Sequence, residues 1–382
     1  MIINQTGGGT QPTGTTQITS NGTHNVAGYE FADVQVPTTA PAHYVEKAND
    51  GTGKLVSGGS SVIDLTGITE VGDYALSGAY YNNTSITGNL DLSSLTHISD
   101  VYAIYRAFDG CTGITSVDLS GLTDITNNCA CTYMFFNCTG ITSVDLSSLT
   151  TINANGSNSE NAACGYMFYG CTGITSVDLS NLITIQGGYC CDSMFRECKN
   201  ISSVNLRNLK EIKGTYSCEY MFGGCMSLVH LDYPSLSLVN NTRIFRNLCA
   251  SCTSLQTVSF YALDTTSFGA ATNQFNSMLS GCSNVTVHFP MRIQSTIGSW
   301  SDVTNGFGGT NTTVLFDIVC TLTGADSNTY TRQQKDSTST ATAWDLGGVL
   351  YYTSGTAEPQ VNDTVYSDAA CTQSVTTVSA IA

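Results

Sequence analysis

The stretch ITSVDLSSLTTI, from Ile141 to Ile152, decides the fold of this 382-residue chain, and near-copies of it begin at Ile114, Ile174 and Ile201. The leucine after the acidic residue marks each copy, and aromatic residues hold its place in the last two. The eight marker positions are Leu65, Leu92, Leu119, Leu146, Leu179, Leu206, Tyr233 and Phe260. All intervals between them are 27 residues except the fourth, which is 33. Such a period is typical of a solenoid, in which each unit buries its apolar face only by stacking on its neighbours.

The repeat also indicates how one unit folds. In the triplet VDL at residues 117–119 two apolar residues flank an acidic one, which is the alternation of a half-buried strand. A second apolar group follows each strand, as in Met134, Phe135 and Cys138. A short helical or turn-like segment would point this group inward and close the coil. We therefore expect about one strand per coil.

The pattern I-x-x-V-x-L-x-x-L-x-x-I, followed by an aromatic residue and C-x-x-L/I, resembles the BspA-type leucine-rich repeats of bacteria, their phages and some protists. The resemblance covers roughly Val62 to Phe289. It implies a mainly β repeat protein with a right-handed parallel solenoid that has short helices or turns on its outer side, and the segments at both ends of the chain add the expectation of small β modules there. It also implies a habit of binding, but no reaction.

Composition shifts divide the chain into four parts. We expect a β attachment segment at residues 1–41, a linker rich in Gly, Ser and Asp at 42–61, the solenoid with its C-terminal cap at 62–313, and a small antiparallel β domain at 314–382. The last part is predicted from short alternating segments separated by turn residues.

Both ends carry further resemblances. The stretch ITSNGTHNVAGYEFADVQVP, from Ile18 to Pro37, is similar to segments near the ends of many tailed-phage virion proteins. Asn21-Gly22 within it predicts a hairpin turn. An equally weighted interpretation is a cap on the open edge of the first coil. The stretch from Tyr351 resembles a C-terminal module of phage and gut-bacterial surface proteins.

Charge excludes several functions. The chain has 29 acidic and 13 basic residues, which argues against nucleic acid and against anionic membranes. No apolar run approaches the length of a transmembrane helix, so we expect no membrane insertion. The opening MIINQTGGGTQPTG has neither a basic region nor an apolar core and does not predict a secretory signal.

Most of the sixteen cysteines fall into two repeat columns rather than a disulfide framework. Neither column has the C-x-x-C spacing of a zinc ribbon. We interpret both as buried, reduced thiols that pack like small apolar residues. The pairs Cys190-Cys191 and Cys129/Cys131 are the exceptions most open to bridging. The first column is Cys111, Cys138, Cys171, Cys198, Cys225, Cys252 and Cys282, and the second is Cys131, Cys164, Cys191 and Cys218.

One polar column is a candidate binding face. Its acidic member precedes each marker residue, and serines flank it. Alternation places these side chains on the solvent face of the sheet. The column is either a solvated face produced by repeat duplication or a ligand face suited to sugars or cations. We expect serine hydroxyls to relieve the repulsion between neighbouring carboxylates, with weak Ca²⁺ binding at most and no other cofactor. The candidate residues are Asp91, Asp118, Asp145, Asp178, Asn205, Asp232, Ser116, Ser143 and Ser176.

No catalytic motif is evident, because the five histidines are scattered and no phosphate loop or zinc-protease motif occurs. The favoured hypothesis is a non-enzymatic virion surface protein of a tailed phage: a fibre, head decoration or baseplate appendage, assembled in the host cytoplasm. Its partners would be other virion proteins, through the N-terminal segment, and a host surface protein or glycan. The sequence leaves a homo-oligomer open. The alternatives are a bacterial cell-surface adhesin and, third, a carbohydrate-active enzyme.

Overall fold

The structure of the protein is a computed structural model. It describes residues 22–26, 29–34, 44–45, 69–72, 76–154, 162–264, 266–268, 273–317, 322–330, 333–334, 341–346, 349–355, 359–368 and 370–381. Most of the expected attachment segment at residues 1–41, and all of the linker at 42–61 except residues 44–45, lie outside this described part.

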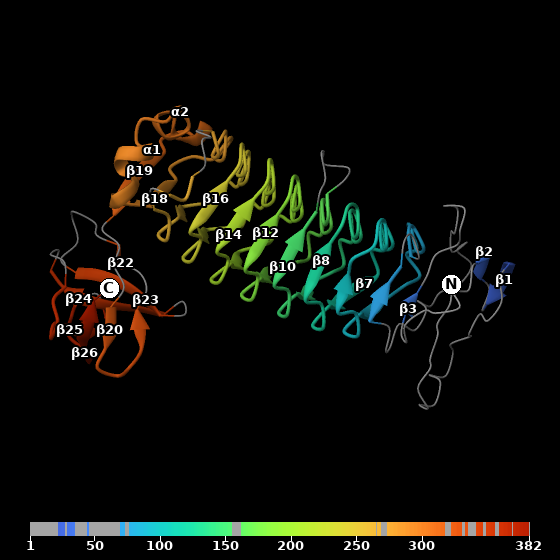
Figure 1. Cartoon of the computed structure of the whole chain (residues 1–382), viewed down its shortest axis with the longest axis horizontal. Helices are drawn as coiled ribbons and strands as arrows, with labels where there is room; N and C mark the ends of the chain where they lie inside the picture. The colour runs from blue at the N-terminus through green and yellow to red at the C-terminus, as the bar shows by residue number, and fades with distance from the viewer. Residues whose placement is uncertain are drawn as a thin grey trace.

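The central part of the chain is a parallel-strand solenoid, whose coils follow one another along the long axis of the molecule (Figure 1). Its first row of strands carries the VDL triplets. The strands of this row are β5 (Gly88–Asp91), β7 (Ile114–Asp118), β9 (Ser143–Asp145), β11 (Ser176–Asp178), β13 (Ser203–Asn205), β15 (His230–Asp232), β17 (Thr257–Ser259), β18 (Thr286–Pro290) and β19 (Thr313–Asp317). This confirms the predicted fold class.

A second row of strands lines another face of the solenoid, so the expectation of one strand per coil is wrong. The chain turns after each marker leucine of the described part, as where Leu122 N–H donates to Leu119 C=O at 2.9 Å. It then forms a short strand around one buried residue, such as Ile125. The second row contains β4 (Glu70–Val71), β6 (His97–Ile98), β8 (Asp124–Thr126), β10 (Thr151–Asn153), β12 (Thr184–Gln186), β14 (Glu211–Lys213) and β16 (Leu238–Asn240). The last six form one sheet, and β3 (Tyr44–Val45) pairs with β4.

The third side of each coil is a ribbon of consecutive turns, which settles the choice between helix and turn. Backbone N–H groups alternate between two acceptors: Phe108 N–H donates to Met134 C=O of the next coil at 2.9 Å, and Ala107 N–H donates back to Ile104 C=O at 3.2 Å. Every fourth residue has positive φ, as at Arg106 (52°) and Gly110 (75°). This ribbon satisfies the backbone without a helix. We call the turn segments that lie between residues 102 and 251, without the strands that separate them, the turn ribbon.

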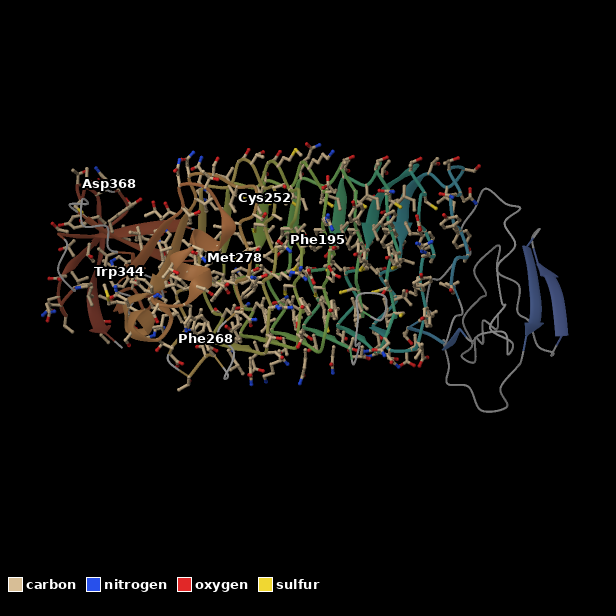
Figure 2. All side chains as sticks on the ribbon, turned by 90° about the horizontal axis from the view of Figure 1, so that it is seen from above. Phe195, Cys252, Phe268, Met278, Trp344 and Asp368 are labelled. Atoms are coloured by element: carbon tan, nitrogen blue, oxygen red, sulfur yellow. The ribbon has the colours of Figure 1, made fainter. Side chains whose placement is uncertain are left out.

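Aromatic residues stack through the centre of the solenoid in the positions that the Met-Phe-Cys motif predicts to be inward. Phe108, Phe135, Phe168, Phe195 and Phe222 are fully buried, and successive ring centroids lie 5.3–5.9 Å apart. Figure 2 locates Phe195, Cys252 and Met278 along the coils. The rings bury a large apolar area and keep the coils in register.

The cysteine columns are buried, as predicted. In the first column each thiol donates to a carbonyl of the preceding coil, for example Cys138 to Phe108 at 2.9 Å and Cys171 to Phe135 at 3.0 Å. Burial raises the pKa of Cys198 to about 12, which keeps the thiol a donor. In the second column the Sγ atoms of Cys164 and Cys191 lie 3.8 Å apart. The reduced state of the thiols stays a prediction.

The C-terminal end of the solenoid carries short helical turns, followed by a last solenoid strand. The helical turns are η2 (Met291–Ile293), α1 (Gln294–Ile297), α2 (Ser301–Thr304) and η3 (Gly306–Gly308). Strand β19 pairs in parallel with β18. The domain boundary expected between residues 313 and 314 therefore cuts through β19, and the solenoid sheet extends to Asp317.

The remainder forms a seven-stranded sheet in which every pairing is antiparallel. Trp344 is fully buried in its small core and donates from Nε1 to Thr353 Oγ1 at 3.0 Å. The strands, in spatial order, are β21 (Thr329–Tyr330), β20 (Leu322–Gly324), β26 (Ser374–Ile381), β25 (Thr364–Tyr366), β24 (Val349–Ser354), β23 (Ala341–Leu346) and β22 (Gln333–Gln334).

The N-terminal hairpin differs from the prediction in its turn. Strand β1 (Gly22–Val26) pairs with β2 (Tyr29–Val34), with Val26 opposite Tyr29. The turn expected at Asn21-Gly22 is therefore wrong, because Gly22 lies in the strand opposite Val34. Ala27 and Gly28, between the two strands in the sequence, lie outside the described residues.

Candidate binding faces of the solenoid

The predicted acidic column forms on the first row of strands, in three registered runs. Asp91, Asp118 and Asp145 are direct partners on β5, β7 and β9. Asp178 pairs with Asn205 on β11 and β13. We call the outward residues of this row the acid face.

The remaining members of the candidate site follow the same register. Asp232 pairs with Ser259, whose hydroxyl donates to its carboxylate. Ser116 and Ser143 are partners, and Ser116 also donates to Asn89 Oδ1 at 2.8 Å. Ser176 belongs to the next run and pairs with Ser203. The sheet is interrupted between β9 and β11, in the coil that carries the six extra residues.

Four aspartates of the acid face, Asp91, Asp118, Asp145 and Asp178, also hold their own turns. The carboxylate of Asp118 accepts the backbone N–H of Ser120 at 2.9 Å, and Asp145 and Asp178 accept in the same way from Ser147 and Ser180. This is an Asx turn, which the side chain stabilises after the strand ends. Backbone amides, rather than the expected serine hydroxyls, are thus the main donors.

Asp91 differs from the other turn-holding aspartates, because it accepts a hydroxyl as well as the amide of its turn. Ser93 Oγ donates to Asp91 Oδ1 at 2.6 Å and Ser93 N–H donates at 3.0 Å. The hydroxyl and the amide lower the pKa of Asp91. Within the described residues no three His, Cys, Asp or Glu side chains gather as a metal site. Weak Ca²⁺ binding by the acid face remains a prediction.

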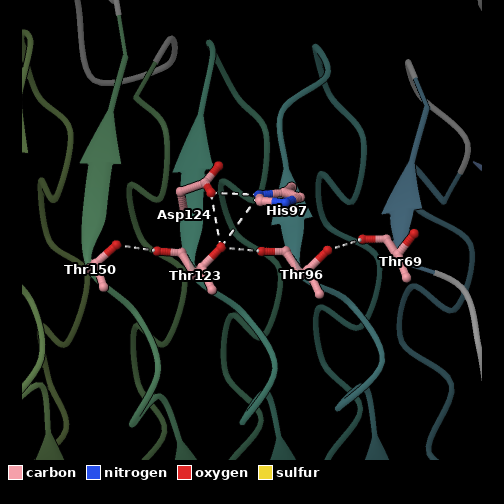
Figure 3. A network of polar contacts seen from close by, with 6 residues as sticks. All are labelled: Thr69, Thr96, His97, Thr123, Asp124 and Thr150. Carbon is pink, nitrogen blue, oxygen red and sulfur yellow. Dashed lines mark hydrogen bonds and ion pairs between the residues drawn. The ribbon is translucent and has the colours of Figure 1, made fainter.

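The second row of strands contains a polar cluster that the sequence did not reveal (Figure 3). His97 Nδ1 and Asp124 Oδ2, from neighbouring coils, lie 2.5 Å apart, and Thr123 Oγ1 lies 3.0 Å from the same carboxylate oxygen. Thr123 also donates to Thr96 C=O at 2.9 Å. Aligning the repeats would have found the pair, since the two residues are 27 positions apart.

The cluster has the residue types of a nucleophilic triad but not its geometry. In a triad the carboxylate and the nucleophile bond to opposite nitrogens of the imidazole. Here Thr123 Oγ1 approaches Nδ1, at 3.4 Å, which is the nitrogen that already faces Asp124. The cluster therefore joins two coils and is not arranged for acyl transfer.

The turn ribbon presents a third face, which the sequence analysis missed. Its partly exposed aromatic side chains stack from coil to coil: ring centroids lie 4.8 Å apart for Tyr133 and Tyr166, and 4.9 Å apart for Tyr189 and Tyr216. Arginines pack on these rings. We call this face the tyrosine–arginine ridge. It consists of Tyr133, Tyr166, Tyr169, Tyr189, Tyr216, Tyr220, Arg106, Arg196, Arg243 and Arg246.

Buried carboxyl groups lie under the ridge. Asp192 is 4% exposed and accepts from Ser193 Oγ at 2.9 Å. Burial, with a smaller contribution from the neighbouring Glu219 carboxylate, raises the pKa of Asp192 to about 7. Burial also raises the pKa of Glu219, which forms an ion pair with Arg246 at 3.2 Å. Asp109 has a pKa raised by burial to about 6, next to Arg106.

The molecule has parallel strands in register, a buried apolar column and polar outer faces. These features define a leucine-rich-repeat solenoid, which is typically a non-enzymatic binding scaffold. The chain belongs to the BspA type leucine rich repeat family, whose pattern matches in six copies over residues 62–161 and 106–278, more than half of the sequence. This confirms the family resemblance.

Two further comparisons complete the picture. No curated protein matches the chain. Among solved structures, a leucine rich repeat protein of T. pallidum is 19% identical over 49% of this chain and 78% of its own, with a TM-score of 0.25. No helix in the described part of the chain is long and apolar enough to cross a membrane.

Proposed function

We propose that the protein is a non-enzymatic virion surface protein of a tailed phage, a fibre, head decoration or baseplate appendage, whose solenoid attaches to a protein or glycan of the host surface. The observation that carries the binding role is the register of the acid face. Parallel pairing aligns Asp91, Asp118 and Asp145 at one position on three successive strands. A ligand that repeats along the solenoid axis would meet the same groups in each coil.

Two observations support a role without catalysis. The His97–Asp124–Thr123 cluster lacks the geometry of a triad. The acid face offers at most one carboxylate per coil, and in Asp118 one oxygen of that carboxylate holds the Asx turn. Carboxylates in such equivalent surroundings suit recognition better than glycoside hydrolysis, which needs two carboxyl groups of divided roles.

The virion assignment rests on the sequence of the N-terminal segment, and particle composition tests it. Purified particles of the phage that encodes the chain should contain the protein by mass spectrometry. A chain lacking residues 1–41 should fold and fail to join particles. Finding the protein on bacterial cells and absent from particles would replace this proposal with the bacterial adhesin alternative.

Host binding is tested with the purified full chain and fluorescent detection on host cells. Asp118→Asn combined with Asp145→Asn should reduce cell binding if the acid face carries it. The matched control, Asp124→Asn combined with Glu211→Gln, removes two charges from the second row and should leave binding unchanged. Equal binding by all three chains would exclude the acid face as the contact surface.

A further inference from the structure

The ridge keeps large side chains where the backbone disfavours them. Tyr133, Tyr166 and Tyr220 have φ of 58°, 55° and 49°. This left-handed region is costly for residues with a bulky side chain, and glycine adopts it freely. Glycine does occupy the next left-handed position of the ribbon in several coils, as at Gly170 and Gly224. Strain of this kind collects where a side chain has a function beyond folding.

The arginines of the ridge concentrate positive charge on a strongly acidic chain. Four of the 13 basic residues lie here, while the net charge is −16. The Arg196 guanidinium lies 4.2 Å from the ring centre of Tyr220, and Arg243 donates to the Tyr216 hydroxyl. Within the described part of the chain neither Arg196 nor Arg243 forms an ion pair with a carboxylate of its own. Both keep N–H donors for an anion.

The packing below fixes these groups in place. Stacking holds neighbouring rings 4.8–4.9 Å apart along the solenoid, which is one coil. The buried Glu219 holds Arg246, whose side chain is still 40% exposed. The ridge is thus a preorganised line of aromatic rings and planar cations, which lowers the entropic cost of binding.

We propose that the tyrosine–arginine ridge binds an acidic polysaccharide, a chain of sugar rings bearing carboxylate, phosphate or sulfate groups, laid along the solenoid axis. This deepens the host-attachment proposal and rests on it. Guanidinium forks match such anions in a two-pronged geometry. Neighbouring rings and guanidinium groups cover the faces of the stacked tyrosines, so their contribution to a sugar is hydrogen bonding through the phenol hydroxyls. A linear polymer fits a line of groups that recurs coil by coil, and the acidic remainder of the molecule repels the polymer from other faces.

Binding of the purified full chain is measured by biolayer interferometry on four immobilised polymers. Polygalacturonate, polyribitol phosphate and dextran sulfate present the three anion types, and dextran is neutral. Binding to at least one anionic polymer, weakening with salt and absent on dextran, is expected. The preferred polymer identifies the anion. No binding to any anionic polymer at low salt would overturn the proposal.

Variants separate recognition from simple charge attraction. Arg196→Gln combined with Arg243→Gln should weaken binding about tenfold or more. The lysine variant, Arg196→Lys combined with Arg243→Lys, keeps the charge and should restore only part of the lost affinity. The matched control, Arg207→Gln with Lys210→Gln, removes two exposed charges elsewhere and should bind normally. Circular dichroism and thermal unfolding confirm that each variant is folded.

Three results would refute a specific site: equal losses in ridge and control variants, full recovery by the lysine variant, or equal binding to polyglutamate, which has the charge without the sugar. Failure of this inference is distinguishable from failure of host attachment. If the ridge variant still binds host cells and the acid-face variant does not, only the proposal about the ridge fails. Ridge binding to a polysaccharide without any binding to host cells contradicts the attachment role and supports the ridge.

Discussion

The acid face and the tyrosine–arginine ridge lie on the same coils, yet their residues are explained in opposite ways. Asp118, Asp145 and Asp178 recur because each holds the turn that ends its strand, with N–H···O distances of 2.9 Å. The ridge residues do not recur faithfully and several, such as Tyr166, occupy left-handed backbone where they add strain. Recurrence alone is thus weak evidence for a ligand, and the case for the acid face rests instead on the strand register that aligns its outward carboxylates. An irregular large residue at a costly position is stronger evidence.

The largest expected effect separates the inner side of the ribbon from its outer side. Phe168→Ala should lower the free energy of unfolding by about 3–5 kcal/mol, because the ring is fully buried between Phe135 and Phe195. Phe136→Ala, on the partly exposed side, should cost less than half as much. Urea denaturation measures both. Equal losses would show that Phe136, which stacks on the ridge residue Tyr169, is part of the core.

Asp192→Asn should change how stability depends on pH. The folded pKa of Asp192, raised by burial to about 7, lies above its unfolded value of 3.8. The group therefore favours folding below about pH 4, and this contribution is lost as pH rises towards 7, by roughly 2–4 kcal/mol. The variant should be the more stable chain at pH 8 and should lose most of this slope. Thermal unfolding from pH 4 to 8 measures it, and an unchanged slope would assign it to Asp109 or Glu219.

Cys171→Ala should lower stability by about 1 kcal/mol without changing the fold, since it removes a small buried group and a thiol donor to Phe135. The described cysteines other than Cys371 are buried. Burial raises the thiol pKa, for example that of Cys111 to about 11. Iodoacetamide at pH 8 should therefore label them only after unfolding. Non-reducing mass spectrometry that finds most cysteines bridged would contradict this.

The smallest effect concerns the acid face. Asp118→Asn combined with Asp145→Asn keeps the acceptor of both Asx turns and removes two adjacent charges. Stability at neutral pH should rise by a few tenths of a kcal/mol, and the gain should fall in high salt. Replacing both residues by alanine should instead cost about 1 kcal/mol each, as for a lost cap. An asparagine variant less stable than the native chain would show that the carboxylates have a further partner.

Periodicity predicted the columns of side chains that the coils share but not all of the backbone structure that carries them. The marker leucines, the Phe and Cys columns and the outward aspartates follow from the alternation of strands and a fixed repeat. The second row was missed because each strand has one buried residue, such as Ile125, too few for a recognisable alternation. The choice of turns over a helix in the turn ribbon was left open because Tyr133 and Arg106 are residues that normally avoid positive φ. Only glycines such as Gly110 indicate it in the sequence.

The register that joins one coil to the next has a consequence for how the number of repeats in the gene can change. The heptapeptide ITSVDLS occurs unchanged at Ile114, Ile141 and Ile174. Loss of residues 114–140 would join equivalent points of two coils. The phenylalanine stack, the cysteine columns and both rows of strands would then continue across the junction. The molecule can therefore shorten or lengthen in whole coils of about 4.8 Å. Unequal recombination within the gene would change the reach of the solenoid in these steps, without a new fold having to evolve.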